Sequence, residues 1–84
     1  MNCILRKKAE DDKQVVYWIY PNDIDVPEEP GIIVIDKKGK RSTVIKKPKA
    51  DEGHNVSLYT GLAYTISYRL IESGNYSGIE EGAW

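Results

Sequence analysis

Four short apolar segments, separated by polar or proline-containing stretches, dominate the first half of the chain. They are rich in β-branched and aromatic residues, and they cover residues 3–7, 14–20, 31–35 and 41–47. This composition is typical of β-strands. Pro21 and Pro48 follow the second and fourth segments. Because proline has no N–H to donate to a central ladder, we expect these two strands to end there.

The connections between the segments indicate a mostly antiparallel meander. Residues 10–13 form a polar turn, and residues 36–40 read Asp-Lys-Lys-Gly-Lys. Asp36 can begin a type I turn, and we expect Gly39 to take the left-handed position that closes it. The acidic segment 22–30 is long for a hairpin loop, so the sequence leaves the strand order open between the sequential 1-2-3-4 and a crossing arrangement.

The hydrophobic period changes from two to nearly four after Asn55, which is a candidate N-cap. Apolar positions at helical spacing then predict a helix over 56–73, and Gly74 is a good stop signal. The core-facing stripe of this helix is Leu58, Tyr59, Leu62, Ala63, Ile66 and Leu70. We expect an irregular tail over 75–84. The prediction is one α+β domain over 1–84: a four-stranded meander with one C-terminal amphipathic helix packed on one face.

The predicted sheet is apolar on both faces, whereas one helix covers only one of them. Val16, Trp18 and Tyr20 lie on the second face. The C-terminal tail with Tyr76, Ile79 and Trp84, a second subunit, or another partner are the candidates for covering it.

The helix carries a second stripe, Tyr64, Tyr68 and Ile71, next to the small residues Ser57 and Gly61. Small residues beside an aromatic stripe allow another helix to approach closely. The alternative is that these side chains lie on a solvated surface, which is common. The candidate protein interface is therefore Trp18, Tyr20, Tyr64, Tyr68 and Ile71.

The formal net charge is −1, which gives no global attraction to nucleic acid or to an anionic membrane. Seven of the twelve basic residues nevertheless lie between positions 37 and 49. This basic hairpin could lie along phosphates, with candidate nucleic-acid contacts at Lys37, Lys38, Lys40 and Arg41. Residues 42–45 include no aromatic side chain for base stacking. A lysine-rich turn also keeps an edge strand soluble and unpaired, and the same patch could meet an acidic protein.

No complete catalytic, cofactor or metal motif is present. Zinc needs about four Cys or His ligands, and the sequence holds only Cys3 and His54. The acidic stretch from Asp23 places Pro27 and Glu28 where a calcium loop needs an oxygen ligand and glycine. Gly39-Lys40 lacks the other residues of a phosphate-binding loop. We expect no enzyme activity, no cofactor, no metal and no small-molecule substrate.

The single cysteine, the three-residue apolar run near the N-terminus and the lack of a stretch of about 18 apolar residues favour a cytoplasmic protein without a membrane span. The sequence predicts a small non-catalytic protein-interaction or assembly module that self-associates as a homodimer. The alternative is a nucleic-acid-binding module that uses the basic 37–49 hairpin.

Overall fold

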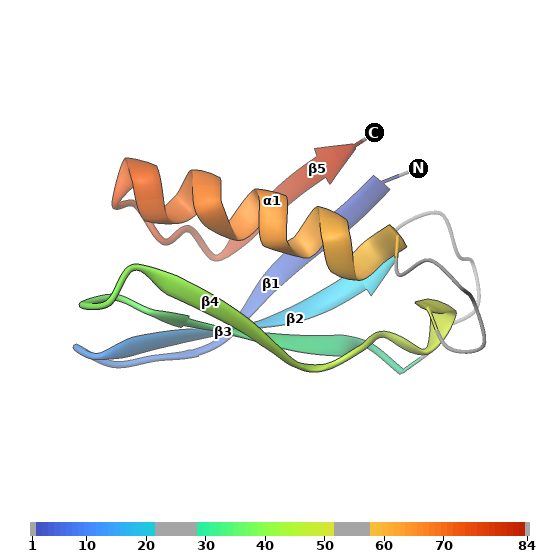
Figure 1. Ribbon diagram of the computed structural model, residues 1–84, viewed down its shortest axis with the longest axis horizontal. Coiled ribbons are helices and arrows are strands. Elements are labelled where there is room, and N and C mark those ends of the chain that lie inside the picture. The colour runs from blue at the N-terminus through green and yellow to red at the C-terminus, as the bar shows by residue number, and fades with distance from the viewer. Residues whose placement is uncertain (1, 22–28, 52–57, 84) are drawn as a thin grey trace.

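The computed structural model describes residues 2–21, 29–51 and 58–83, and it shows an α+β fold with one antiparallel sheet and one helix (Figure 1). The sheet order is β4-β3-β2-β1-β5, so the first four strands follow the sequential order. The elements are β1 (Asn2–Glu10), β2 (Gln14–Pro21), β3 (Gly31–Asp36), β4 (Arg41–Lys46), the 3₁₀ turn η1 (Lys49–Asp51), α1 (Leu58–Ser73) and β5 (Ile79–Ala83).

The core lies between α1 and the inner face of the sheet. Alternate residues of each central strand point toward the helix, as the period of two requires. Their side chains have no solvent exposure: Cys3, Leu5, Val15, Tyr17, Ile19, Ile33 and Ile35. Tyr59, Leu62, Ala63, Ile66 and Leu70 meet them from the helix, which confirms the predicted core stripe at these positions. The prediction is wrong for Leu58, which is 39% exposed at the first residue of the helix.

The two ends of α1 are held differently. Gly74 takes a positive φ of 72° and donates its N–H to the Leu70 carbonyl, so the predicted helix stop is confirmed. The predicted N-cap Asn55 lies outside the described residues. Within them, the buried carboxylate of Asp51 in η1 accepts hydrogen bonds from the N–H groups of Tyr59 and Thr60, at 3.1 and 2.8 Å. Asp51 therefore caps the helix from a separate element.

The expectation of an irregular tail over 75–84 is wrong for residues 79–83. They form β5, which pairs antiparallel with β1 and makes the sheet five-stranded instead of four-stranded. The reason is tertiary: β1 is nine residues long and has a free edge beside the returning chain. Gly82 lets β5 approach α1, because a Cβ there would lie 2.7 Å from Ile66 Cγ1.

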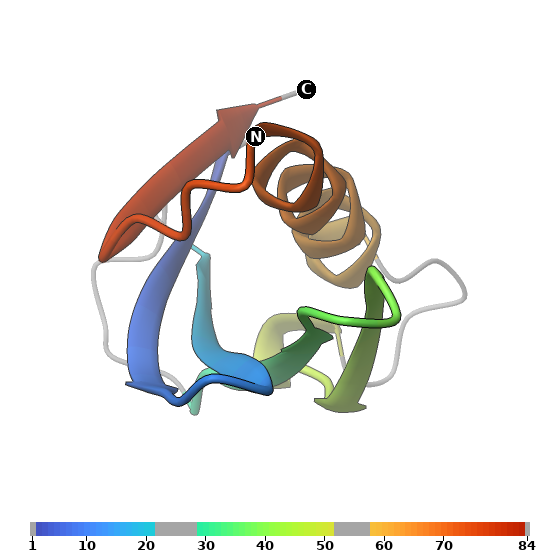
Figure 2. The same cartoon turned by 90° about the vertical axis from the view of Figure 1, so that its left-hand side faces the viewer.

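The helix bridges both outer edges of the curved sheet (Figure 2). On β4, the Val44 N–H donates to the Tyr64 hydroxyl at 3.0 Å. On β5, the Arg69 guanidinium donates to the Glu81 carbonyl at 2.8 Å. Unpaired edge groups are templates for pairing with other chains. These two side chains cap one such group on each edge.

Replacing Tyr64 by phenylalanine should lower the free energy of unfolding by about 1 kcal/mol, because the Val44 N–H loses its acceptor. Urea denaturation followed by tryptophan fluorescence measures this, and amide hydrogen exchange at Val44 should rise. Tyr68→Phe is the matched control, since Tyr68 is 54% exposed on the same helix. Equal losses in the two variants would contradict the capping role.

The β3–β4 turn differs from the sequence prediction in one residue. Lys40, not Gly39, takes the left-handed position, with a φ of 52°. Asp36 begins the turn as expected, and its Oδ1 accepts the Lys38 and Gly39 N–H groups, both at 3.1 Å. A Cβ on residue 39 would lie 2.8 Å from Asp36 Oδ2, so glycine serves close approach there.

Lys40→Gly should raise the free energy of unfolding by about 0.5–1 kcal/mol, because glycine relieves the left-handed strain of a side-chain-bearing residue. Lys38→Gly removes the same charge from the same turn without that relief, and it should be neutral or slightly destabilising. Thermal unfolding followed by circular dichroism gives the melting temperatures of the two variants and separates them. A lower melting temperature for Lys40→Gly than for Lys38→Gly would refute this account.

Candidate interaction surface

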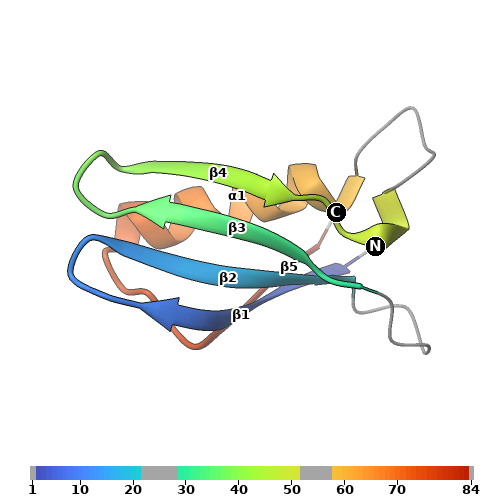
Figure 3. The ribbon, with the colours of Figure 1, turned by 90° about the horizontal axis from the view of Figure 1, so that it is seen from below.

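The outer face of the sheet, turned away from α1, is the candidate interaction surface. It is the face seen in Figure 3, and no described segment crosses it. The strand residues that alternate with the core positions lie here. Those that are apolar and partly buried are Ile4, Val16, Trp18, Tyr20, Ile32 and Val34. We call this set, together with Arg6 and Lys8, the outer face.

The described part of the tail does not cover the outer face. Tyr76 packs against the core, and Ile79 pairs with Arg6 at the sheet edge with 58% of its surface exposed. Trp84 lies outside the described residues. Ile45, at the bulge of β4, is 63% exposed. Within the described chain, the apolar outer face is thus open to solvent or to a partner.

Two cations lie over the two aromatic rings of the outer face. The Lys8 ammonium is 5.3 Å from the Trp18 ring centroid, and the Arg6 guanidinium is 5.7 Å from that of Tyr20. Lys8 is the extra residue of a β-bulge in β1, where the register with β2 shifts. Cation–π attraction holds each charge close to the sheet while its side chain stays exposed.

A shallow hollow opens at one end of the outer face. Ile4, Arg6, Tyr20 and Pro21 line it. It combines three apolar or aromatic walls with one guanidinium. Such a hollow can hold a side chain or chain end that is partly apolar and partly anionic.

The structure separates the two halves of the predicted interface. Trp18 and Tyr20 come together on the outer face, whereas the helix residues lie on the other side of the sheet. Tyr64 is used to cap β4, and Ile71 packs against the core. Tyr68 is the member of the helix stripe that is largely exposed.

The predicted nucleic-acid contacts are divided as well. Lys37 forms an ion pair with Glu10 at 2.6 Å at the surface, and its ammonium lies 5.7 Å from the Tyr76 ring centroid. Lys38, Lys40 and Arg41 are exposed at the turn. The aromatic side chains that the basic hairpin lacks lie on the outer face instead.

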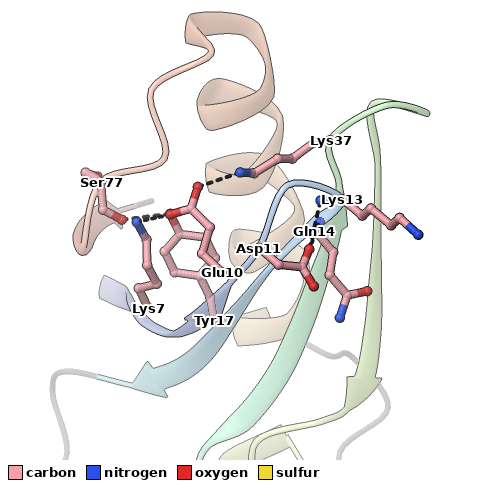
Figure 4. Close-up of polar contacts among 8 residues, drawn as sticks. All are labelled: Lys7, Glu10, Asp11, Lys13, Gln14, Tyr17, Lys37 and Ser77. Atoms are coloured by element: carbon pink, nitrogen blue, oxygen red, sulfur yellow. Dashed lines mark hydrogen bonds and ion pairs between the residues drawn. The ribbon is translucent and has the colours of Figure 1, made fainter.

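A polar cluster ties the two hairpin turns and the tail together (Figure 4). Glu10 forms ion pairs with Lys37 and Lys7, and these contacts lower the pKa of its carboxyl. The Tyr17 hydroxyl donates to the Ser77 carbonyl at 2.7 Å, and burial raises the pKa of Tyr17 to about 12. These contacts hold the turns and residue 77 in place, so we interpret the cluster as structural.

In the β1–β2 turn, the Asp11 carboxylate accepts the N–H groups of Lys13 and Gln14, both at 2.8 Å (Figure 4). These hydrogen bonds lower the pKa of Asp11. This is a turn-forming arrangement. It explains the polar turn predicted for residues 10–13.

Chemically reactive groups are few among the described residues. Burial raises the pKa of the Cys3 thiol to about 12, with a smaller contribution from the nearby Asp51 carboxylate. A protonated buried thiol is a poor nucleophile. No group of three or more His, Cys, Asp or Glu side chains in 2–21, 29–51 and 58–83 could hold a metal ion. His54 and the acidic residues 23–28 lie outside these ranges.

No helix within the described part of the chain is long and apolar enough to cross a membrane. Comparisons with protein-family models, with curated proteins and with solved structures found no match to this chain.

Sequence reasoning missed Arg6 and Lys8 as members of the outer face. Their signal was present in part: residues 4 and 6 alternate with the buried residues 3 and 5, so they belong opposite the core. The position of Lys8 depends on the bulge, which single-sequence patterns do not reveal.

Proposed function

We propose that this protein is a small non-catalytic protein-interaction module that acts through the outer face of its sheet. The observation that supports this most is the open outer face: six partly buried apolar side chains with two exposed cations, and no described segment over them. Apolar side chains that stay partly exposed on an uncovered sheet face can form an interaction site.

The capped edges of β4 and β5 favour the outer face, and not a strand edge, as the binding surface. Tyr64 and Arg69 occupy polar groups of β4 and β5 that an added strand would need. The outer face has no such obstruction among the described residues. A second copy of the chain, forming a homodimer, is one partner that this function allows, and the buried thiol of Cys3, the single cysteine, fits a cytoplasmic location.

Light scattering coupled to size exclusion, over about 5–500 µM protein, tests self-association through this face. If a second copy is the partner, the mass of the wild type should rise above 9.5 kDa with concentration. Val34→Lys, in the middle of the outer face, should remain a monomer at all concentrations. Tyr68→Lys adds the same charge on the helix and should associate like the wild type.

The outcomes separate the two predicted interfaces. If Tyr68→Lys abolishes association and Val34→Lys does not, the helix stripe is the interface and the outer face is not. If the wild type is a strict monomer, the homodimer is excluded, and the module needs a different protein partner.

Nucleic-acid binding through the basic hairpin is a second candidate, because Lys38, Lys40 and Arg41 are exposed together at one turn. A mobility assay with single-stranded and duplex oligonucleotides at low salt tests it. Binding should weaken steeply with salt and with Lys38→Ala/Lys40→Ala. No salt-dependent shift would end this hypothesis.

A further inference from the structure

We infer that the outer face binds an acidic, partly apolar segment of another protein, with carboxylates at Arg6 and Lys8 and apolar side chains over β2 and β3. This inference rests on the proposed function and names the chemistry of the partner. In this inference Arg6 and Lys8 determine which partner binds, although the sequence pattern did not single them out.

The cations of the outer face lack carboxylate partners among the described residues, in contrast to several cations elsewhere. Lys7 and Lys37 both pair with Glu10, and Lys46 pairs with Glu29 at 3.4 Å. No ion pair involves Arg6 or Lys8 within the described chain. Their charge is thus available to a ligand on the outer face.

The rings beneath these cations hold them in a position in which they can bind an anion. A guanidinium that lies over a tyrosine ring is held at that ring, while its N–H groups extend outward in the plane of the fork. A carboxylate can then accept two parallel hydrogen bonds from Arg6 with little further ordering of the side chain. The Lys8 ammonium over Trp18 offers a second, less directional contact.

The surroundings of the cations require an apolar component in the ligand. Ile4, Tyr20 and Pro21 form the hollow beside Arg6. Val16 and Val34, paired on β2 and β3, continue the apolar surface beyond Trp18. A purely polar anion would leave these side chains in water, whereas a segment with alternating acidic and apolar residues covers both kinds of surface.

Two other occupants fit less well. In a two-fold dimer of outer faces, the same patch of both copies meets, so Arg6 and Lys8 would add like charges to one interface. A single-stranded nucleic acid would stack its bases on the rings. Lys8 and Arg6 already lie over the rings of Trp18 and Tyr20, so bases could stack there only by displacing these two cations.

Fluorescence anisotropy with defined probes tests the inference. The probe is a labelled peptide of about ten residues in which Asp and Glu alternate with Leu and Phe, a size that can span the outer face. The matched peptide carries Lys in place of every acid, and a labelled oligothymidylate of similar length is the third probe. The wild type should bind the acidic peptide, more weakly as salt rises, and should not bind the lysine peptide.

Charge reversal gives the decisive comparison. Arg6→Glu/Lys8→Glu should weaken binding of the acidic peptide by about tenfold or more and should gain affinity for the lysine peptide. Lys38→Glu/Lys40→Glu changes the net charge equally but leaves the outer face intact, and it should stay within about twofold of the wild type. Circular dichroism melts check that both variants fold. If Arg6→Glu/Lys8→Glu does not fold, Arg6→Gln/Lys8→Gln replaces it.

The remaining outcomes overturn the inference, and they differ in what they leave. Equal losses in the two charge-reversed variants would place the effect on overall charge or on the hairpin. Tighter binding of the oligothymidylate than of the acidic peptide would make nucleic acid the ligand. If no peptide binds but the wild type self-associates and Val34→Lys does not, the proposed function stands with a second copy as partner. If neither peptide binding nor self-association occurs, the proposed function fails too.

Discussion

Replacing Asp51 by alanine should lower the free energy of unfolding by about 3 kcal/mol, a large part of what a domain of this size possesses. Asp51 is only 4% exposed. It accepts the Tyr59 and Thr60 N–H groups and, at 2.7 Å, the Thr60 hydroxyl. The variant removes the acceptor that these buried donors use and takes a negative charge away from the positive end of α1. Urea denaturation followed by tryptophan fluorescence measures the loss.

Two variants show which part of the effect comes from burial. Asp36→Ala also removes a carboxylate that accepts two backbone N–H groups, but Asp36 is exposed in a turn, so it should lose only about 1 kcal/mol. Asp51→Asn keeps an acceptor oxygen without the charge and should fall between the wild type and Asp51→Ala. A loss for Asp51→Ala no larger than that for Asp36→Ala would show that the helix does not depend on this cap.

The capping role of Asp51 shows why part of the fold was not predictable from the sequence. Capping patterns look for a Ser, Thr, Asp or Asn immediately before the helical period, and Asn55 fits that description. Asp51 lies seven positions before the first residue of α1, in a turn of its own. It reaches the helix end only because η1 and α1 pack together, and tertiary packing of this kind leaves no local sequence signal.

The strands show the same division between local and tertiary information. β2 and β3 were predictable because β-branched and aromatic residues alternate with the period of a sheet. β5 reads Ile-Glu-Glu-Gly-Ala, and glutamate and glycine are depleted in strands. Its residues become a strand because the edge of β1 offers hydrogen-bonding partners.

The candidate surface was also predictable from the sequence only in part. Trp18 and Tyr20 were placed on a second sheet face by alternation alone, and the structure has them there. Lys8 was not foreseen, because the first strand was expected to end at Lys7, whereas β1 continues to Glu10 through a bulge. Arg6 lay within the expected strand, but it was not assigned to the outer face. Chemistry contributed by a bulge escapes a strictly alternating pattern.

Gly82→Ala should lower the free energy of unfolding by about 2 kcal/mol, because a Cβ at this position has no room. It would lie 2.7 Å from Ile66 Cγ1 and 2.9 Å from Ile66 Cδ1. Ile66 is 1% exposed and cannot swing aside without disturbing the core. The strand must therefore move off the helix, and amide hydrogen exchange across β1 and β5 should rise together with the loss in urea denaturation.

A control and a rescue make this result specific to the contact between β5 and α1. Gly78→Ala lies in the same tail with nothing within 4 Å of the new Cβ, so it should be neutral or slightly stabilising. Ile66→Val removes the Cδ1 atom, so Gly82→Ala should cost about 0.5–1 kcal/mol less in that background. If Gly82→Ala behaves like Gly78→Ala, β5 does not pack against the helix, and the capping of that edge by Arg69 would have to be abandoned with it.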